Sequence, residues 1–120
     1  MGPIDGTYAS HDENFSLTII NSDDRPGTFN GIFKAKDLSI GDLTYNNVTG
    51  EYRYVIQQPV FQIGFYAIIR PESTEYVITD HWNGVRTNDK SLLLSGLRTY
   101  ITSAGSYDIH YFEKILFKMT

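Results

Sequence analysis

The chain has 120 residues, enough for one domain whose hydrophobic core needs no disulfide or metal to hold it together. It contains no Cys, which excludes disulfides, thiolate zinc sites and a Cys nucleophile. Ten Lys and Arg against 14 Asp and Glu give a net charge of −4 without a basic stripe, so we expect no nucleic acid and no membrane surface as partner.

Short segments that alternate apolar or aromatic residues with polar ones run from Asp5 to Lys118, a pattern typical of strands with one buried face. The aromatic share of 14%, mostly Tyr and Phe, also favours strands. In chain order we predict eight strands: Asp5–Ser10, Phe15–Asn21, Thr28–Lys36, Val48–Ile56, Val60–Arg70, Glu75–Arg86, Ser91–Thr102 and Tyr107–Lys118.

Turn signals separate these strands, among them Ser22–Gly27, Gln57–Pro59, Pro71–Thr74 and Thr87–Lys90. Only Asp37–Asn47 is a longer loop. Short connections make successive strands pair with each other, and eight such strands can close on themselves. The predicted fold class is therefore all-β, an eight-stranded antiparallel up-and-down barrel, with residues 1–120 forming one domain.

The segment Ser91–Tyr100 has two interpretations. Its leucines could form one face of a helix, but Gly96 lies in its middle and β-branched and aromatic residues follow. We therefore predict a strand.

The order of several short motifs resembles the avidin and streptavidin family. Gly6-Thr7-Tyr8 is similar to the family's opening Gly-x-Trp, Val48–Tyr52 to its Leu-Thr-Gly-x-Tyr, and Trp82-Asn83-Gly84 to its Trp-Ser-Gly. Further matches are Phe15–Ile19, Thr28–Phe33, Ile63–Phe65 and Ile115–Phe117. The resemblance covers nearly the whole chain. It implies an eight-stranded up-and-down barrel that assembles as a dimer or tetramer.

The biotin-binding residues of that family are mostly replaced. The two residues that hold the ureido oxygen from the first strand and the loop after it correspond to Ser10 and Asn14, and the Tyr of the third strand to Phe33. Other polar or Trp positions correspond to Ala35, Ile69, Ile78, Asp80, Leu97 or Arg98, and Ile115, and only Trp82 is kept. Each missing partner leaves a polar group unpaired, so we expect no tight binding of biotin.

The alternation places ten residues inside the barrel: Tyr8, Ser10, Phe33, Ala35, Phe65, Ala67, Ile69, Ile78, Asp80 and Trp82. Most are apolar, so the interior is either filled by side chains or holds a small pocket. In the second case a small non-biotin ligand would bind at the open end, held by Ser10, Asn14, Phe33, Asp80 and Trp82. The loop Asp37–Asn47 would then be its lid, by analogy with the family.

Asp80 is the most informative of these residues, because a carboxylate inside a barrel needs a partner. Arg98 and Ser10 are the two candidates. The alternatives are that Asp80 anchors a ligand beside Trp82, or that it lies in solvent at the mouth of the barrel.

Catalytic, metal and cofactor sites find little support. His11 lies in a loop, and we expect His81 and His110 to point outward from separate strands, without metal-site spacing. His81 and Asp80 lie on opposite faces of one strand, so they cannot work as parts of a catalytic triad. No phosphate or dinucleotide motif occurs. We therefore predict no enzyme, no metal and no cofactor.

Apolar residues predicted on the outer wall include Tyr66, Ile68, Val77, Tyr100 and Phe112. Such a surface favours self-association, and we predict a homo-oligomer, with a partner protein as the alternative. No apolar run spans a membrane and no leader is visible, so the chain is either cytosolic or has lost a leader, and its localisation stays open.

Overall fold

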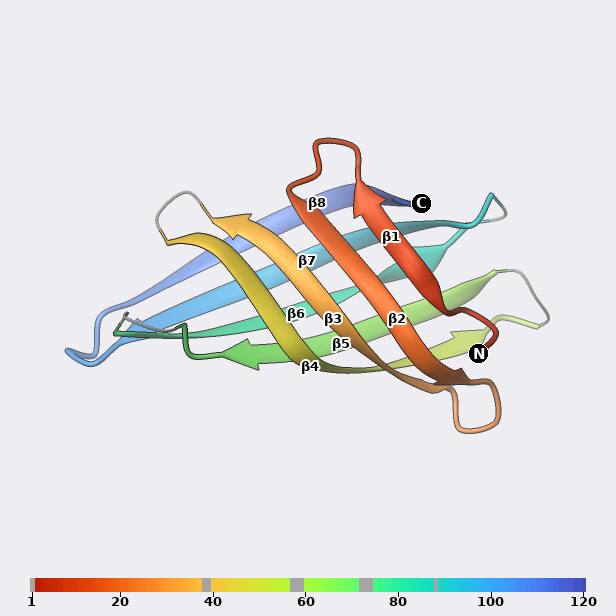
Figure 1. The fold of residues 1–120 in the computed structure, drawn as a ribbon, viewed down its shortest axis with the longest axis horizontal. Helices are drawn as coiled ribbons and strands as arrows, with labels where there is room; N and C mark the ends of the chain where they lie inside the picture. Colours follow the sequence, from red (N-terminus) through yellow and green to blue (C-terminus); the bar gives the residue numbers. More distant parts are fainter. Residues whose placement is uncertain (1, 38–39, 57–59, 72–74, 88) are drawn as a thin grey trace.

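The computed structural model of the chain describes residues 2–37, 40–56, 60–71, 75–87 and 89–120. They form a closed antiparallel barrel in which each strand pairs with its sequence neighbours and β1 pairs with β8 (Figure 1). The strands are β1 (Gly6–Ser10), β2 (Phe15–Asp23), β3 (Thr28–Asp37), β4 (Gly41–Tyr54), β5 (Phe61–Ile69), β6 (Tyr76–Arg86), β7 (Ser91–Thr102) and β8 (Tyr107–Met119). The predicted fold class is confirmed.

Seven of the eight strands begin and end within two residues of the predicted bounds. The strand interpretation of Ser91–Tyr100 is confirmed, since β7 pairs with β6 and β8 along its length. The predicted connection Gln57–Pro59, and residues 72–74 and 88 of two others, lie outside the described residues.

The predicted loop Asp37–Asn47 is wrong, because β4 already begins at Gly41. Leu43 and Tyr45 are buried and continue the inward-facing series of the strand. A β-bulge at 46–47 opposite Ile32 shifts the register, so the alternation changes phase before Val48 and hides the strand in the sequence. Residues 41–47 therefore do not form a lid.

The barrel closes along only part of its length. Residues 41–48 of β4 pair with β3 alone, and β5 joins β4 only from Thr49 onward. In the same way, residues 107–116 of β8 pair with β7 alone, and β1 meets β8 only at Phe117–Met119. Strands β1–β4 and β5–β8 therefore part at the end of the barrel that carries the β7–β8 turn (Figure 1).

The inward-facing residues are those predicted, with two corrections. Nine of the ten predicted interior residues are buried, and Ile69 is partly buried. Tyr100, predicted outside, is buried because it lies two residues from Arg98 on the same face of β7. Phe112, also predicted outside, packs inside with its ring 5.3 Å from that of Trp82 at an interplanar angle of 9°.

A bulge in β8 explains the position of Phe112. Glu113 and Lys114 together oppose Ser95, and Lys114 has a φ of 49°. The Lys114 N–H donates to Ser95 Oγ at 3.1 Å. The extra residue turns Phe112 to the interior. Strict alternation counted back from Phe117 would place Phe112 on the outer face.

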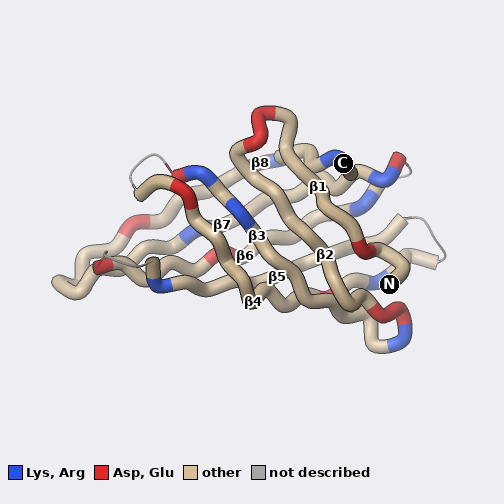
Figure 2. Tube along the Cα trace, viewed as in Figure 1, with Lys and Arg blue, Asp and Glu red and all other residues tan. Residues whose placement is uncertain are grey.

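Figure 2 shows acidic residues in the turn between β1 and β2, and both acidic and basic residues in the turn between β2 and β3. No helix in the described part of the chain is long and apolar enough to cross a membrane.

Candidate functional site

A buried carboxylate lies at the centre of the barrel interior. Asp80 is 0% exposed and its carboxylate accepts four hydrogen bonds. Arg98 donates twice, from Nε to Oδ1 and from Nη2 to Oδ2, each at 2.8 Å. The Tyr45 hydroxyl donates to Oδ1 at 3.0 Å, and the Trp82 indole N–H to Oδ2 at 3.0 Å. We call these four residues the Asp80 cluster.

The sheet register explains why these side chains meet. Asp80 and Arg98 are direct partners on β6 and β7, and Trp82 follows Asp80 on the same face of β6. Tyr45 reaches them from β4, which is separated from β6 by β5 in the barrel. A carboxylate offers about four lone-pair positions, and here each has a donor. Asp80 is therefore neither in solvent nor available to a ligand without displacing one of these donors.

A second carboxylate extends the cluster towards the end where the strands part. Asp37, on β3, lies 3.4 Å from Arg98 Nη1 and also accepts from the Tyr100 hydroxyl. Burial and this bond raise the pKa of Tyr100 to about 12. Burial and the charge of Asp80 raise the pKa of Tyr45 above its usual value. These bonds link β3, β4, β6 and β7 where backbone pairing between β4 and β5 ends.

The protonation state of Arg98 follows from two opposing effects. Burial lowers its pKa, while the hydrogen bonds and charge of Asp80 raise it, and the pKa rises overall. Arg98 therefore stays a cation inside the barrel, and the Asp80 cluster contains an ion pair that is almost completely buried.

Aromatic rings fill the interior around Trp82. Its ring lies between 5.3 and 6.3 Å from the rings of Phe15, Phe33, Phe65, Phe112 and Phe117. Gly96 faces this ring so closely that an added Cβ would lie 2.4 Å from it. This packing supports the filled interior over the internal pocket.

The structure separates the five predicted ligand-binding residues into two groups. Phe33, Asp80 and Trp82 meet in the interior. Ser10 Oγ instead donates to Asp12 Oδ1 at 2.7 Å and accepts from the Phe15 N–H at 3.0 Å. Asn14 donates to the same Asp12 from its backbone and its side chain, each at 3.0 Å. Ser10 and Asn14 therefore shape the β1–β2 turn, and of the two candidate partners for Asp80 only Arg98 is confirmed.

Sequence reasoning missed Tyr45, Asp37 and Tyr100 as parts of this network. Tyr45 and Asp37 fell in the predicted loop, and Tyr100 was placed on the outer wall. The alternating triplet Leu43-Thr44-Tyr45 is the one signal that could have placed Tyr45 on a strand.

A second buried cation lies elsewhere in the interior. Arg86 is 8% exposed, its guanidinium lies 5.4 Å from the ring centre of Phe61, and its Nε has no hydrogen-bond partner among the described residues. The cation–π contact compensates part of the cost of burying this charge. Of the two interior cations, only Arg98 forms an ion pair within the described residues.

The histidines do not come together. His81 is exposed on the outer wall, with its ring 4.6 Å from that of Tyr66. His110 does not point outward as predicted, since its ring contacts Tyr100 at 5.0 Å and its Nε2 lies 2.9 Å from Asp108. The described residues contain no group of three His, Cys, Asp or Glu side chains that could hold a metal ion.

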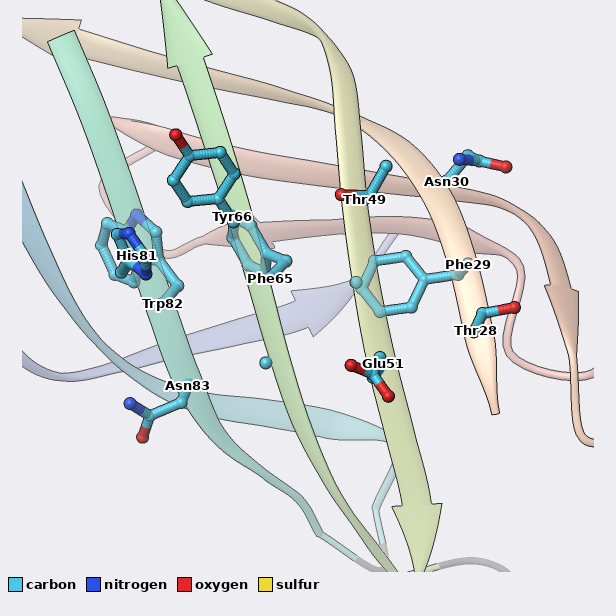
Figure 3. A pocket seen from close by; sticks show the side chains of 12 residues that line it. Thr28, Phe29, Asn30, Thr49, Glu51, Phe65, Tyr66, His81, Trp82 and Asn83 are labelled. Atoms are coloured by element: carbon cyan, nitrogen blue, oxygen red, sulfur yellow. The ribbon is translucent and has the colours of Figure 1, made fainter. Parts of the chain in front are cut away.

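A groove of about 720 Å³ crosses the outer surface of β3–β6 (Figure 3). The registers place its outward residues in two rows, each running across the four strands. The first row is Thr28, Glu51, Gly64 and Asn83, and the second is Asn30, Thr49, Tyr66 and His81. We call these eight residues the outer groove. Figure 3 shows Glu51 and Asn83 on opposite sides of β5, with no side chain between them because Gly64 lies there.

Next to the outer groove, nine outward positions of β5–β8 carry no Lys, Arg, Asp or Glu, and exposed Glu113 and Lys114 border them at the bulge of β8. Nine residues form this uncharged face: Ile68, Val77, Thr79, Leu97, Thr99, Ile101, Tyr107, Ile109 and Tyr111. Tyr107 and Tyr111 are 74% and 75% exposed, and Ile68, Ile101 and Ile109 are also exposed. By contrast, the outer surface of β3 and β4 carries exposed Lys34, Lys36 and Asp42.

Neither the models of known protein families nor the curated protein sequences give a match to this chain.

Proposed function

We propose that the chain is a non-catalytic assembly module on a streptavidin-like barrel, and that it forms at least a dimer through its uncharged face. The main support is that nine neighbouring outward positions on four strands include no Lys, Arg, Asp or Glu. On a chain with 20% charged residues, such a surface indicates a contact with another protein surface.

A second copy fits this face better than a charged partner does. Two copies of a chain with a net charge of −4 repel each other, and the repulsion is smallest where neither copy carries charge. The same face on both subunits also gives a closed twofold interface. β-Branched residues and tyrosines on flat strands suit the packing of one sheet upon another.

The size of the face is adequate for this role. Each outward position covers about 4.8 Å by two rises of about 3.4 Å, so the nine positions cover about 300 Å². The largest apolar patch of an ordinary monomer measures roughly 300–600 Å² and is often functional. A stable interface buries about 800 Å² on each partner, so neighbouring polar residues would supply the rim.

We expect the barrel not to bind biotin tightly. The eight-stranded connectivity supports the streptavidin-like architecture, but Phe33 stands where the family has its ureido-binding Tyr, and Ile78 and Asp80 stand where it has the Ser and Thr of the sixth strand. All three are buried, and Asp80 is saturated by donors of the chain itself. Saturating biotin should therefore leave the melting temperature unchanged, while a ligand at 100 times its Kd would add about 2.7 kcal/mol.

The test is the mass of the protein in solution, measured by light scattering after size exclusion. The variant Ile109→Lys puts a charge in the uncharged face, where Ile109 is 43% exposed. Ile20→Lys is the matched control, since Ile20 is 41% exposed on β2, outside that face. The wild type and the Ile20→Lys variant should be dimers or tetramers, and the Ile109→Lys variant should be a monomer.

A monomeric wild type at high micromolar concentration would overturn the proposal, whether or not a partner protein then binds the face. An oligomer that persists in the Ile109→Lys variant would also overturn it, because the contact would then lie elsewhere. A melting shift with biotin would show that the substitutions around Phe33 do not prevent binding.

A further inference from the structure

We propose that the outer groove binds a neutral, hydroxyl-rich ligand of the carbohydrate class, an oligosaccharide segment lying across β3–β6. This inference does not depend on the assembly proposal. The groove is separate from the filled interior and borders the uncharged face only at Tyr66 and His81.

The first observation is that the polar side chains of the groove are uncommitted. Thr28, Asn30, Thr49 and Asn83 are exposed, and their side chains form no hydrogen bond within the part of the chain that the structure describes. Each Asn amide offers two donors and one acceptor, and each Thr hydroxyl offers both functions. They form a cross-strand array that matches the alternating donors and acceptors of sugar hydroxyls.

The second observation is the glycine at the floor of the groove. Of the ten glycines, Gly64 alone has neither a positive φ nor an atom closer than 3.0 Å to an added Cβ. The nearest atoms to that Cβ would be the Trp82 carbonyl oxygen at 3.5 Å and Asn83 Cβ at 3.8 Å, both ordinary contacts. A glycine inside a strand is destabilising relative to alanine. The fold does not require Gly64, so the bare floor between Glu51 and Asn83 points to a ligand that lies there.

The charge of the groove selects the class of ligand. No Lys or Arg lines it, and the neighbouring Arg53 already donates to Glu51 and to the carbonyls of Gly27 and Tyr52, which disfavours phosphate or sulfate groups. Its only acidic side chain, Glu51, lies 3.3 Å from Arg53 Nη2 and can accept from a hydroxyl beside Asn83. Tyr66 is 40% exposed and its ring meets His81 edge-on, which leaves ring surface for the apolar face of a sugar.

The dimensions favour several sugar units over one. Four strands about 4.8 Å apart give a groove about 15 Å across. Its volume of about 720 Å³ lies within the range of ligand sites, which is roughly 300–1,000 Å³. A groove open to solvent suits binding along a chain rather than enclosure of a small molecule.

The experiment titrates the full chain, labelled with ¹⁵N, with tetrasaccharides of glucose, mannose, xylose, galactose and N-acetylglucosamine at millimolar concentration. We expect saturable amide shifts at Gly64, Tyr66 and Asn83 with at least one of these sugars. The Cβ of Gly64→Val meets only ordinary contacts, so we expect this variant to fold. Its side chain covers the floor, so it should bind about tenfold more weakly or not at all.

Asn83→Ala should weaken binding in the same way, whereas Asn46→Ala is the matched control on β4. Asn46 is exposed and does not line the groove, so its variant should bind as the wild type does. The Ile109→Lys variant should keep the sugar shifts even as a monomer, which separates this proposal from the assembly. No saturable shift with any of the five sugars, or equal binding by Gly64→Val, would overturn the carbohydrate site.

Discussion

Asp80 and Arg98 show how a single ion pair inside the barrel limits what the barrel can do. Both side chains are almost completely buried, at 0% and 1% exposed, and two hydrogen bonds of 2.8 Å join them. A buried ion pair contributes little net stability, because desolvating the two charges offsets their attraction. Removing one partner is different, since it leaves the other charge buried alone. The pair itself therefore adds little net stability, and together with Tyr45 it links β4 to β6 and β7.

We predict that Asp80→Asn lowers the free energy of unfolding by about 3–5 kcal/mol, the usual effect of removing one partner of a buried ion pair. The double variant Asp80→Leu with Arg98→Met replaces both charges by apolar groups and should recover only part of that loss, because the Tyr45 hydroxyl and the Trp82 N–H lose their acceptor. Urea unfolding of the wild type and both variants measures these differences.

The matched control is the exposed ion pair of Glu51 and Arg53, whose side chains are 73% and 63% exposed. Glu51→Gln should cost below about 1 kcal/mol, because solvent screens such a pair. If Asp80→Asn cost no more than Glu51→Gln, the cluster at Asp80 would not be a buried charge pair in solution.

At the scale of the strands, bulges decide which residues face the interior. The bulge at 46–47 of β4 and the bulge at 113–114 of β8 each reverse the alternation of the strand before them. The first turns Tyr45 toward Asp80, and the second turns Phe112 onto Trp82. The contact between Tyr45 and Asp80 and the contact between Phe112 and Trp82 therefore each depend on one extra residue in a strand.

The strands also differ in how firmly they are held. Three residue pairs join β1 to β8, from Tyr8–Met119 to Ser10–Phe117, whereas eleven pairs join β6 to β7. We predict that backbone amides at the β1–β8 contact exchange with deuterium at least about tenfold faster than those between β6 and β7, because the shorter ladder opens at lower free energy. Hydrogen exchange followed by NMR measures both sets in one sample. Equal protection would show that the barrel opens only as a whole.

At the scale of the whole molecule, the three regions of the barrel have different chemistry. The interior is aromatic with a buried ion pair, the outer groove on β3–β6 is polar, and the nine residues of the uncharged face on β5–β8 are apolar or hydroxyl-bearing. Period-two alternation allows this division, since each strand contributes to two surfaces at once. Assembly and ligand binding can therefore be altered by separate substitutions.

Stability at alkaline pH is a property of the whole molecule, because folding raises the pKa of five tyrosines from different strands. Burial is the first cause that raises the pKa of Tyr8, Tyr45, Tyr52, Tyr54 and Tyr100 above 10.0. Well below pH 10 these rings are neutral in both folded and unfolded chains. Above it, the unfolded chain loses protons first, so the free energy of unfolding should fall as pH rises.

Each such ring contributes up to about 1.4 kcal/mol per pH unit in that range. For Tyr100 the loss should continue until its folded pKa of about 12. Urea unfolding at a series of pH values above 9 or so measures the slope, and Tyr100→Phe and Tyr45→Phe should each make it shallower. A slope that neither substitution changes would contradict the assignment of the shifts to these rings.

The sequence by itself determined the class of fold, the order of the strands and most of the core. Alternation and turn residues are local features, so seven strands, and the inward orientation of Phe33, Asp80 and Trp82, could be predicted from them.

The partners of Asp80 depend on register between strands, and the sequence offered Arg98 and Ser10 as equal candidates. Only the tertiary structure decided for Arg98, added Tyr45 and Asp37, and placed Ser10 and Asn14 in a turn. It also decided where Gly64 lies between Glu51 and Asn83, since the pairing of β4, β5 and β6 brings together residues far apart in the chain. The physical reason is that a bulge reverses the side of the sheet to which every preceding residue of the strand points. In a single sequence, this break in the alternation looks the same as a loop.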